Sequence, residues 1–139
     1  MEITEVRIKL VEKTAERLMA FCSITIDGAF VIRDLKLIGG PHGLFVAMPS
    51  RKLCAHCRKC SSKNPLKARF CNTCGHQMQS QYLPCDKDGR VRLYVDIAHP
   101  INVECCELIQ DRVMAEYEAE SIRAKSLGYA SRYEEFRDE

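Results

Sequence analysis

Four cysteines form two pairs whose spacing suits a metal ion. Two residues separate Cys57 from Cys60 and Cys71 from Cys74, and ten residues lie between the pairs. A two-residue gap lets both thiolates of a pair reach one ion, and two pairs complete a tetrahedron at ~2.3 Å from zinc. We therefore predict one structural Zn²⁺ bound by these four cysteines. Four thiolates leave no coordination position open for water or substrate.

Other residues near the two pairs offer alternative ligands. They are Cys54, Cys85, His56 and His76. Residues 57–75 read CRKCSSKNPLKARFCNTCG, which resembles the short zinc-ribbon family, with two Cys-x2-Cys pairs around Asn-Pro and Ala-Arg-Phe-Cys. On this resemblance we prefer Cys57 and Cys60 as the first pair. The family usually has glycine after that pair, where this chain has Ser61.

The same segment concentrates the positive charge of the chain. The net charge is only +2, yet residues 51–85 contain seven basic side chains and no Asp or Glu. Those seven are Arg51, Lys52, Arg58, Lys59, Lys63, Lys67 and Arg69. A carboxylate-free basic segment favours binding to nucleic-acid phosphates, although such a run also commonly serves only as a solubilising loop.

The elements that must position these residues are mostly strands. Period-2 alternation or short apolar runs predict strands over 3–11, 17–26, 30–38, 44–48 and 90–98. Asp27-Gly28 predicts a two-residue hairpin turn, because both positions of such a turn need positive φ. If residues between 48 and 90 form a loop, the last two strands should pair as neighbours.

The C-terminal part predicts one helix. Asn102 is a suitable N-cap, and the helix should run to about residue 125. An apolar stripe should consist of Cys106, Ile109, Val113 and Tyr117, flanked by Leu108 and Met114. We expect Cys22, Cys105 and Cys106 to be small buried hydrophobic residues rather than ligands. Tyr129, Tyr133 and Phe136 predict a short second helix.

The predicted fold class is therefore α+β, an antiparallel β-meander with a C-terminal helix. Residues 1–52 and 87–125 should form the host domain, and residues 53–86 should form a zinc ribbon inserted in the hairpin between strands 4 and 5. Residues 126–139 should form an acidic tail. One face of the sheet would remain open, so we expect a homodimer to cover it or to pair its edges.

The host segments resemble, in order, the septation protein family, also called stage V sporulation protein G. The matching pieces are MEITEVRIKL, SITID with FVIRD, GLFVAMPSRK, DIAHPIN, and IQD through V to EY. The resemblance implies a small α+β homodimer that binds nucleic acid and influences septation, sporulation and gene expression in bacteria. It places Arg51 and Lys52 at basic positions implicated in DNA contact. The family normally has a short turn where this chain carries the ribbon.

These features favour a nucleic-acid-binding regulator, DNA or RNA being the partner. The alternative is an adaptor whose ribbon and acidic tail recruit a protein. An enzyme is the weakest interpretation, because no nucleophile motif or phosphate loop is present, and His99 near Asp96 better suits a structural corner than catalysis. With neither an apolar span nor a signal sequence, we expect a cytoplasmic chain with no membrane or small-molecule partner.

Overall fold

The computed structural model describes residues 1–12, 17–78 and 85–133. The chain forms two compact units, Met1–Pro49 with Ala98–Glu139, and Ser50–Ile97. We call them the host unit and the ribbon unit. The ribbon unit is continuous in sequence and interrupts the host unit, and the predicted insertion, 53–86, lies inside its range.

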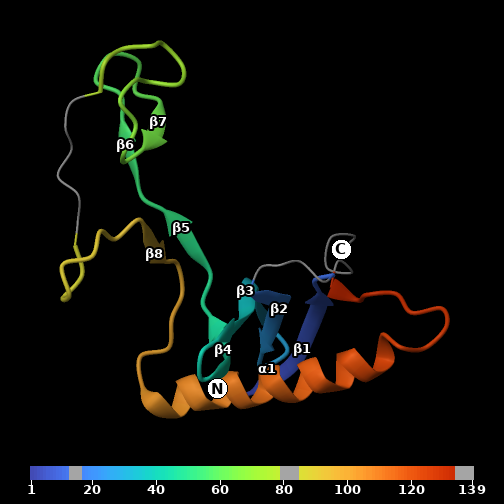
Figure 1. The fold of residues 1–139 in the computed structure, drawn as a ribbon. Helices are drawn as coiled ribbons and strands as arrows, with labels where there is room; N and C mark the ends of the chain where they lie inside the picture. Colours follow the sequence, from blue (N-terminus) through green and yellow to red (C-terminus); the bar gives the residue numbers. More distant parts are fainter. Residues whose placement is uncertain (13–16, 79–84, 134–139) are drawn as a thin grey trace. The chain divides into compact units, whose positions relative to one another are not determined.

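The host unit is built on a four-stranded antiparallel sheet (Figure 1). Its strands follow the chain in the order β1 (Ile3–Leu10), β2 (Leu18–Ile26), β3 (Phe30–Gly40) and β4 (Gly43–Ala47). The turn between β2 and β3 has φ of 53° at Asp27 and 64° at Gly28, as the predicted hairpin requires. The connection is one residue longer than predicted, because Ile26 pairs with Phe30. The predicted α+β meander is confirmed for these four strands.

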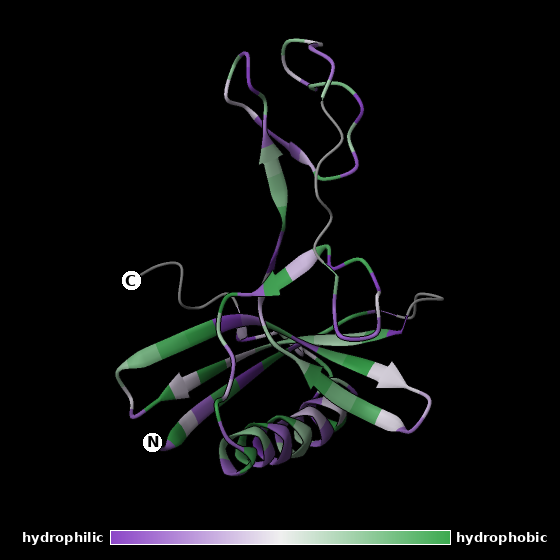
Figure 2. Ribbon diagram, turned by 90° about the vertical axis from the view of Figure 1, so that its left-hand side faces the viewer, coloured by the Kyte–Doolittle hydropathy of each residue, from purple (hydrophilic) through white to green (hydrophobic). Residues whose placement is uncertain are grey.

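One helix packs on this sheet. Helix α1 (Val103–Arg123) begins after Asn102, whose side chain accepts a hydrogen bond of 2.8 Å from the backbone N–H of Cys105. This confirms the predicted N-cap. Strands and helix carry both hydrophilic and hydrophobic residues, as the colours of Figure 2 show. The buried core between them consists of Ile3, Val6, Ile8, Ala20, Cys22, Ile24, Leu35, Leu37, Ile109 and Val113.

A glutamine also ties α1 to the edge of the sheet. Gln110 Oε1 accepts a hydrogen bond of 3.1 Å from the backbone N–H of Val46, and its Nε2 donates to the carbonyl of Leu44 at 3.2 Å. The side-chain amide thus satisfies backbone groups of edge strand β4 that another strand would otherwise pair. Two directional hydrogen bonds therefore hold the helix at this edge, in addition to apolar packing.

Two details of the host prediction are wrong. Residues 90–98 do not pair with β4; only β8 (Tyr94–Asp96) forms, and it pairs with β5 (Ser50–Lys52) in a separate two-stranded sheet. Pro49 separates β4 from β5, and proline cannot donate a ladder hydrogen bond. In the helix, Cys106 is exposed and Cys105 packs against the core instead, so the apolar stripe starts one residue earlier than predicted.

The chain returns to the sheet after α1 (Figure 1). Tyr133 is buried; its hydroxyl lies 3.3 Å from a carboxylate oxygen of Asp34, and the guanidinium of Arg33 lies 5.1 Å from its ring centroid. Arg7, which alternates with core residues of β1, donates to the carbonyl of Arg132 at 3.1 Å. The segment ending at Tyr133 therefore lies against the sheet face opposite α1.

The predicted second helix is only partly within the described residues. Residues 129–132 are not helical, Tyr133 is in 3-10 conformation, and Phe136 lies outside the described residues. Hydrogen bonds to the buried Glu120 join the segment to the end of α1. Glu120 accepts hydrogen bonds from the hydroxyl of Tyr129 at 2.5 Å and from Arg123 Nε at 2.9 Å.

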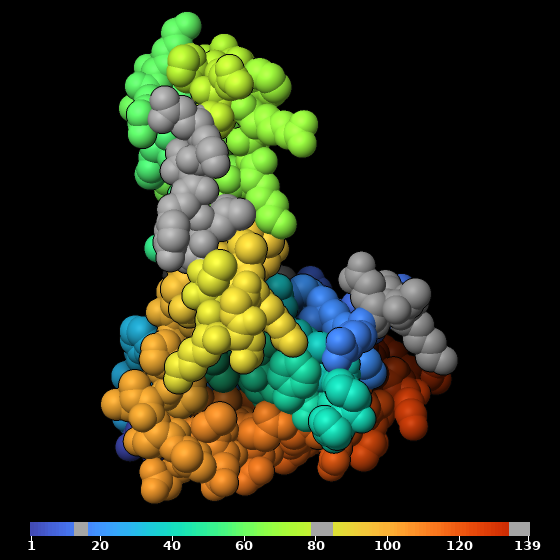
Figure 3. Space-filling model, turned by 60° about the vertical axis from the view of Figure 1, so that its left-hand side comes forward, coloured from blue at the N-terminus to red at the C-terminus, as the bar shows by residue number. Residues whose placement is uncertain are grey.

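The described part of the ribbon unit contains little regular structure. Besides β5 and β8 it contains the hairpin of β6 (Cys54–His56) and β7 (Lys63–Pro65) and two isolated bridges, Phe70 with Gln77 and Cys85 with Val91. Residues 53–78 pack closely with one another in the space-filling view (Figure 3). No helix in the described residues combines the length and the apolar character that crossing a membrane requires.

Candidate metal centre

The four predicted cysteines lie together in the ribbon unit. The sulfurs of Cys57, Cys60, Cys71 and Cys74 are all within 4.8 Å of one another. Across the two pairs, Cys57 Sγ lies 3.7 Å from Cys74 Sγ, and Cys60 Sγ lies 3.6 Å from Cys71 Sγ. A tetrahedron with metal–sulfur bonds of ~2.3 Å has edges of about 3.8 Å. The arrangement therefore fits one four-coordinate metal ion, whereas a disulfide would bring two sulfurs to about 2.05 Å.

Each cysteine pair sits in the same local turn, repeated fourteen residues later. The N–H of Cys57 donates to the carbonyl of Ser62 at 2.9 Å, and the N–H of Cys71 donates to the carbonyl of His76 at 2.8 Å. Within each turn, the N–H two residues after the first cysteine points at its sulfur, at 3.4 Å in both cases. The spacing of the cysteines thus builds two equivalent knuckles, with backbone dipoles that favour thiolates.

Both knuckles close through a left-handed residue. Ser61 has φ of 63° and Gly75 has φ of 75°, and their N–H groups donate to the carbonyls of Cys57 and Cys71 at 2.9 and 3.0 Å. Glycine adopts this conformation without steric cost, while the Cβ of serine causes steric strain in it. Serine in place of the usual glycine at position 61 therefore adds strain to the turn but preserves its geometry.

The side chain of Asn64 supports the centre through hydrogen bonds near the sulfurs. Its side chain is 1% exposed, and its Nδ2 donates to the carbonyl of Ser62 at 3.1 Å and lies 3.5 Å from Cys71 Sγ. Its Oδ1 accepts from the N–H of Asn72 at 2.9 Å. In the sequence, Asn64 stands out only as part of the resemblance to zinc ribbons. Its role follows from its burial and its hydrogen bonds beside Cys71, which no local sequence pattern indicated.

The sulfurs do not ionise equally without a cation. Hydrogen bonds from the backbone N–H groups of Cys74 and Thr73 lower the pKa of Cys71 to about 5. Hydrogen bonding with Ser62 lowers the pKa of Cys60. A backbone hydrogen bond with His76 acts to lower the pKa of Cys74, but burial and the neighbouring sulfurs outweigh it and raise that pKa to about 11. A divalent cation at the centre would allow all four groups to be thiolates.

The alternative ligands lie outside this cluster. Cys54 is exposed, and its sulfur lies 3.5 Å from the carbonyl of Lys52; Cys85, His56 and His76 are also exposed. In the host unit, burial raises the pKa of Cys22 to about 12, which fits the small buried hydrophobic residue predicted there. Cys106, in contrast, is exposed, so its predicted burial is wrong.

The seven predicted basic residues all lie in the ribbon unit and are all exposed. Arg51 and Lys52 belong to β5, while Arg58 and Lys59 lie between the two cysteines of the first knuckle. Lys63 begins β7, and Lys67 and Arg69 lie between β7 and the second knuckle. Within the described part of the chain none of the seven forms an ion pair.

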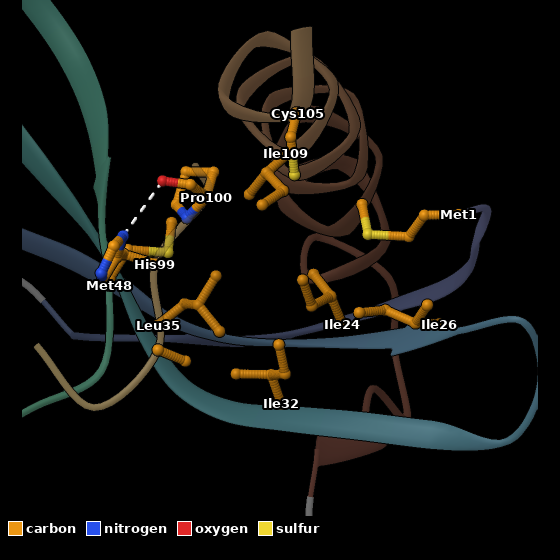
Figure 4. A pocket seen from close by; sticks show the side chains of 11 residues that line it. Met1, Ile24, Ile26, Ile32, Leu35, Met48, His99, Pro100, Cys105 and Ile109 are labelled. Carbon is orange, nitrogen blue, oxygen red and sulfur yellow. Dashed lines mark hydrogen bonds between the residues drawn. The ribbon is translucent and has the colours of Figure 1, made fainter. Parts of the chain in front are cut away.

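The host unit has an apolar pocket of about 120 Å³ (Figure 4). Ile24, Ile32 and Leu35 of the sheet line it together with Ile109 of α1 and residues 98–100. A ring nitrogen of His99 lies 3.1 Å from the carbonyl oxygen of Pro100, which fits the structural corner predicted for this histidine. Pockets for drug-sized ligands usually measure about 300–1,000 Å³, so this one is small for such a ligand.

Comparison with known proteins identifies the family. The SpoVG family profile matches residues 1–119. The chain belongs to the SpoVG family. A SpoVG relative named putative septation protein, from Bdellovibrio bacteriovorus, is 38% identical over 128 residues, covering 92% of this chain and 81% of the relative.

Two further SpoVG relatives give the same result. Putative septation protein SpoVG 1 of Listeria monocytogenes is 40% identical over 118 residues, which cover 85% of this chain and 79% of the relative. Putative septation protein SpoVG of Agathobacter rectalis is 37% identical over 120 residues, which cover 86% and 95%. The resemblance of the host segments to this family is therefore confirmed.

Proposed function

We propose that this SpoVG-family chain is a regulatory protein that binds nucleic acid through a ribbon unit held by one structural zinc ion. The exposed cations of that unit support the proposal most directly. Residues 51–85 carry seven of them with no carboxylate, and the four cysteines fit one ion. Zn(Cys)₄ carries a formal charge of −2, which leaves the segment at about +5. A surface of this kind attracts phosphates.

Zinc would act here as a fold-forming ion. Cys57, Cys60, Cys71 and Cys74 would occupy its four positions, so no substrate could reach it, and we propose no catalytic activity for the chain. Because the ribbon unit has little apolar packing, the binding of zinc would supply its folding free energy. The relatives are named putative septation proteins. We propose that this chain likewise influences septation or sporulation, through gene expression.

The nucleic-acid contact can be tested by removing charge at matched places. Lys63→Gln with Lys67→Gln removes two cations from the ribbon unit, and Lys36→Gln with Lys125→Gln removes two exposed cations from the host unit. Each double variant has the same net charge. If the ribbon contacts phosphates, only the first pair should weaken binding of a duplex and lower the salt slope, by about 0.9 per lost contact.

The measurement is the dissociation constant for a random duplex and a single strand between about 50 and 200 mM salt. A zinc-to-protein ratio of one in every variant would show that the ribbon stays folded. Binding that does not respond to salt would contradict phosphate contact. A protein partner retained from nuclease-treated lysate, with no nucleic-acid binding, would instead favour an adaptor that uses the ribbon and the acidic tail.

We also propose that the chain forms a homodimer, which would present two ribbons to one nucleic acid and raise avidity. Large apolar side chains near the start of α1 support this, since Ile101 is 89% exposed and Val103 is 69% exposed. The segment ending at Tyr133 already lies on the second face of the sheet, so the dimer need not cover that face. A monomeric mass in light scattering at micromolar concentration would contradict the dimer.

A further inference from the structure

An aromatic ring stands exposed among the cations of the ribbon unit. Phe70 is 62% exposed, although phenylalanine is usually among the more buried residues. Its backbone is held in place on both sides. The N–H of Met78 donates to the carbonyl of Arg69 at 2.8 Å, and the N–H of Cys71 begins the second knuckle. The ring therefore projects from a fixed backbone position beside the metal centre.

The charges around this ring distinguish it from other exposed aromatic residues. Lys67 and Arg69 come shortly before Phe70 in the sequence, both are exposed, and no carboxylate occurs between residues 51 and 85. Phe30 of the host unit has a similar exposure, 65%, but it follows a turn that contains Asp27. An exposed apolar ring that follows two exposed cations, in a segment without carboxylates, suits a ligand that alternates rings with negative charges.

We propose that Phe70 stacks on an unpaired base of single-stranded nucleic acid while Lys67 and Arg69 contact the adjacent phosphates. The proposal rests on the nucleic-acid binding proposed above and specifies the form of the ligand. Base–aromatic stacking tolerates any base sequence, because every base has a π-face. In a duplex those faces are already stacked on each other. The ribbon should therefore prefer single strands.

The absence of tryptophan from the chain gives a direct probe of stacking. The sequence contains no Trp, so Phe70→Trp introduces a single indole at the proposed platform. A single-stranded oligothymidylate should quench its fluorescence on binding, because a stacked base lies in contact with the ring. Phe30→Trp places the same probe at an equally exposed position of the host unit and should show no such quenching.

The second measurement compares affinities. Phe70→Ala should weaken binding of the oligothymidylate by roughly 5- to 150-fold. It should change binding of the duplex formed with the complementary strand little. The single-strand defect should persist between about 50 and 200 mM salt, since stacking releases no counterions. Phe30→Ala should leave both affinities unchanged. Zinc-to-protein ratios near one would confirm that each variant keeps the ribbon folded.

The possible results separate this inference from the function on which it rests. If the chain binds duplex and single strand alike, and Phe70→Ala changes neither, stacking is overturned while nucleic-acid binding stands. If the unmodified chain binds neither form, both proposals fail. If Phe70→Ala abolishes capture of a protein but leaves oligothymidylate binding intact, the ring belongs to a protein interface, and the stacking proposal is overturned.

Discussion

The two units of this chain keep their structure by different means. The host unit buries ten residues in one apolar cluster between its sheet and α1. In the ribbon unit the buried residues among those described are Ala55, Cys57, Asn64 and Cys71, of which two are thiols and one is an amide. Apolar burial provides the host with its folding free energy, while the ribbon depends on what its sulfurs bind.

Because of this difference, the two units should unfold independently of each other. Substituting a host core residue should destabilise the sheet and helix without moving the sulfurs. Removing a sulfur should unfold the ribbon without opening the apolar core. The sequence continuity of the ribbon unit, from Ser50 to Ile97, favours such independence. Variants in each unit should therefore show whether the host unit and the ribbon unit unfold independently.

Cys71→Ser should have the largest effect. It removes one of the four sulfurs, so zinc should be lost and the ribbon unit should unfold; structural zinc contributes about 10–16 kcal/mol in zinc-finger peptides. Amide NMR spectra should lose the dispersed signals of residues 53–78 and keep those of the sheet and α1. Zinc content measures the loss directly.

Cys54→Ser is the matched control, because Cys54 is exposed and lies outside the cluster. It should keep one zinc per chain and an unchanged spectrum apart from its neighbours. Full zinc content in Cys71→Ser would show that the ligand set is wrong. Loss of host signals in that variant would show that the two units do not fail separately.

Ile109→Ala should produce the next largest effect, in the host unit. Ile109 is 5% exposed in the core, and truncating a buried isoleucine costs about 2–5 kcal/mol. Ile122→Ala changes the same residue type on the same helix at 70% exposure and should stay within about 0.5 kcal/mol. Denaturant unfolding followed by circular dichroism measures both. Zinc content should not change, and a drop in it would contradict the separation.

Glu120→Gln should have a smaller effect that depends on pH. Burial acts to raise the pKa of Glu120, but hydrogen bonds from Tyr129 and Arg123 outweigh it and hold that pKa below its ordinary value. The carboxylate therefore stabilises the fold above the unfolded pKa, about 4.3. That contribution disappears as pH falls through the lowered pKa.

The expected loss in Glu120→Gln at neutral pH is about 1–3 kcal/mol, typical of hydrogen bonds to a charged group. The difference from the unmodified chain should shrink in acid, as measured by the free energy of unfolding between about pH 7 and pH 3. Glu104→Gln, at an exposed position in the first turn of α1, provides a control without these partners. A pH-independent difference would mean that the ionised form of Glu120 contributes nothing.

Exchanging the residues that close the two knuckles should give the smallest effect. Ser61→Gly should relieve left-handed strain and tighten zinc binding by about 1 kcal/mol or less, since the flexibility of glycine in the unfolded chain offsets part of the gain. Gly75→Ser should weaken it similarly, because a Cβ there meets no atom within 4 Å and only the φ of 75° opposes it. Competition with a chelator measures both. Equal affinities would show that the turns are not strained.

Much of the local structure could be predicted because it depends on near neighbours. The Asp27-Gly28 turn and the cap at Asn102 each involve a few consecutive residues, and the structure has both. The cysteine pairs could be predicted for the same reason, as each knuckle closes within six residues. The choice of first pair needed the resemblance to zinc ribbons, because Cys54 offers the same spacing with Cys57.

Other features could not be predicted because they depend on distant parts of the chain. Helical spacing alone did not distinguish Cys105 from Cys106, which differ by one position around α1. The strand at Tyr94–Asp96 had two neighbouring partners available in sequence, and it pairs with β5 rather than β4. The burial of Tyr133 against the far face of the sheet required contacts with residues about 100 positions earlier.

The sequence by itself determined the metal-binding spacing, the concentration of positive charge, the order of the first four strands and the start of the helix. These properties follow from backbone geometry over a few residues and from composition. Only the tertiary structure decided that Asn64 supports Cys71, that Phe70 is exposed and that the chain returns to cover its own sheet. Burial and long-range pairing are set by how all segments share the available surface, and no local pattern contains that information.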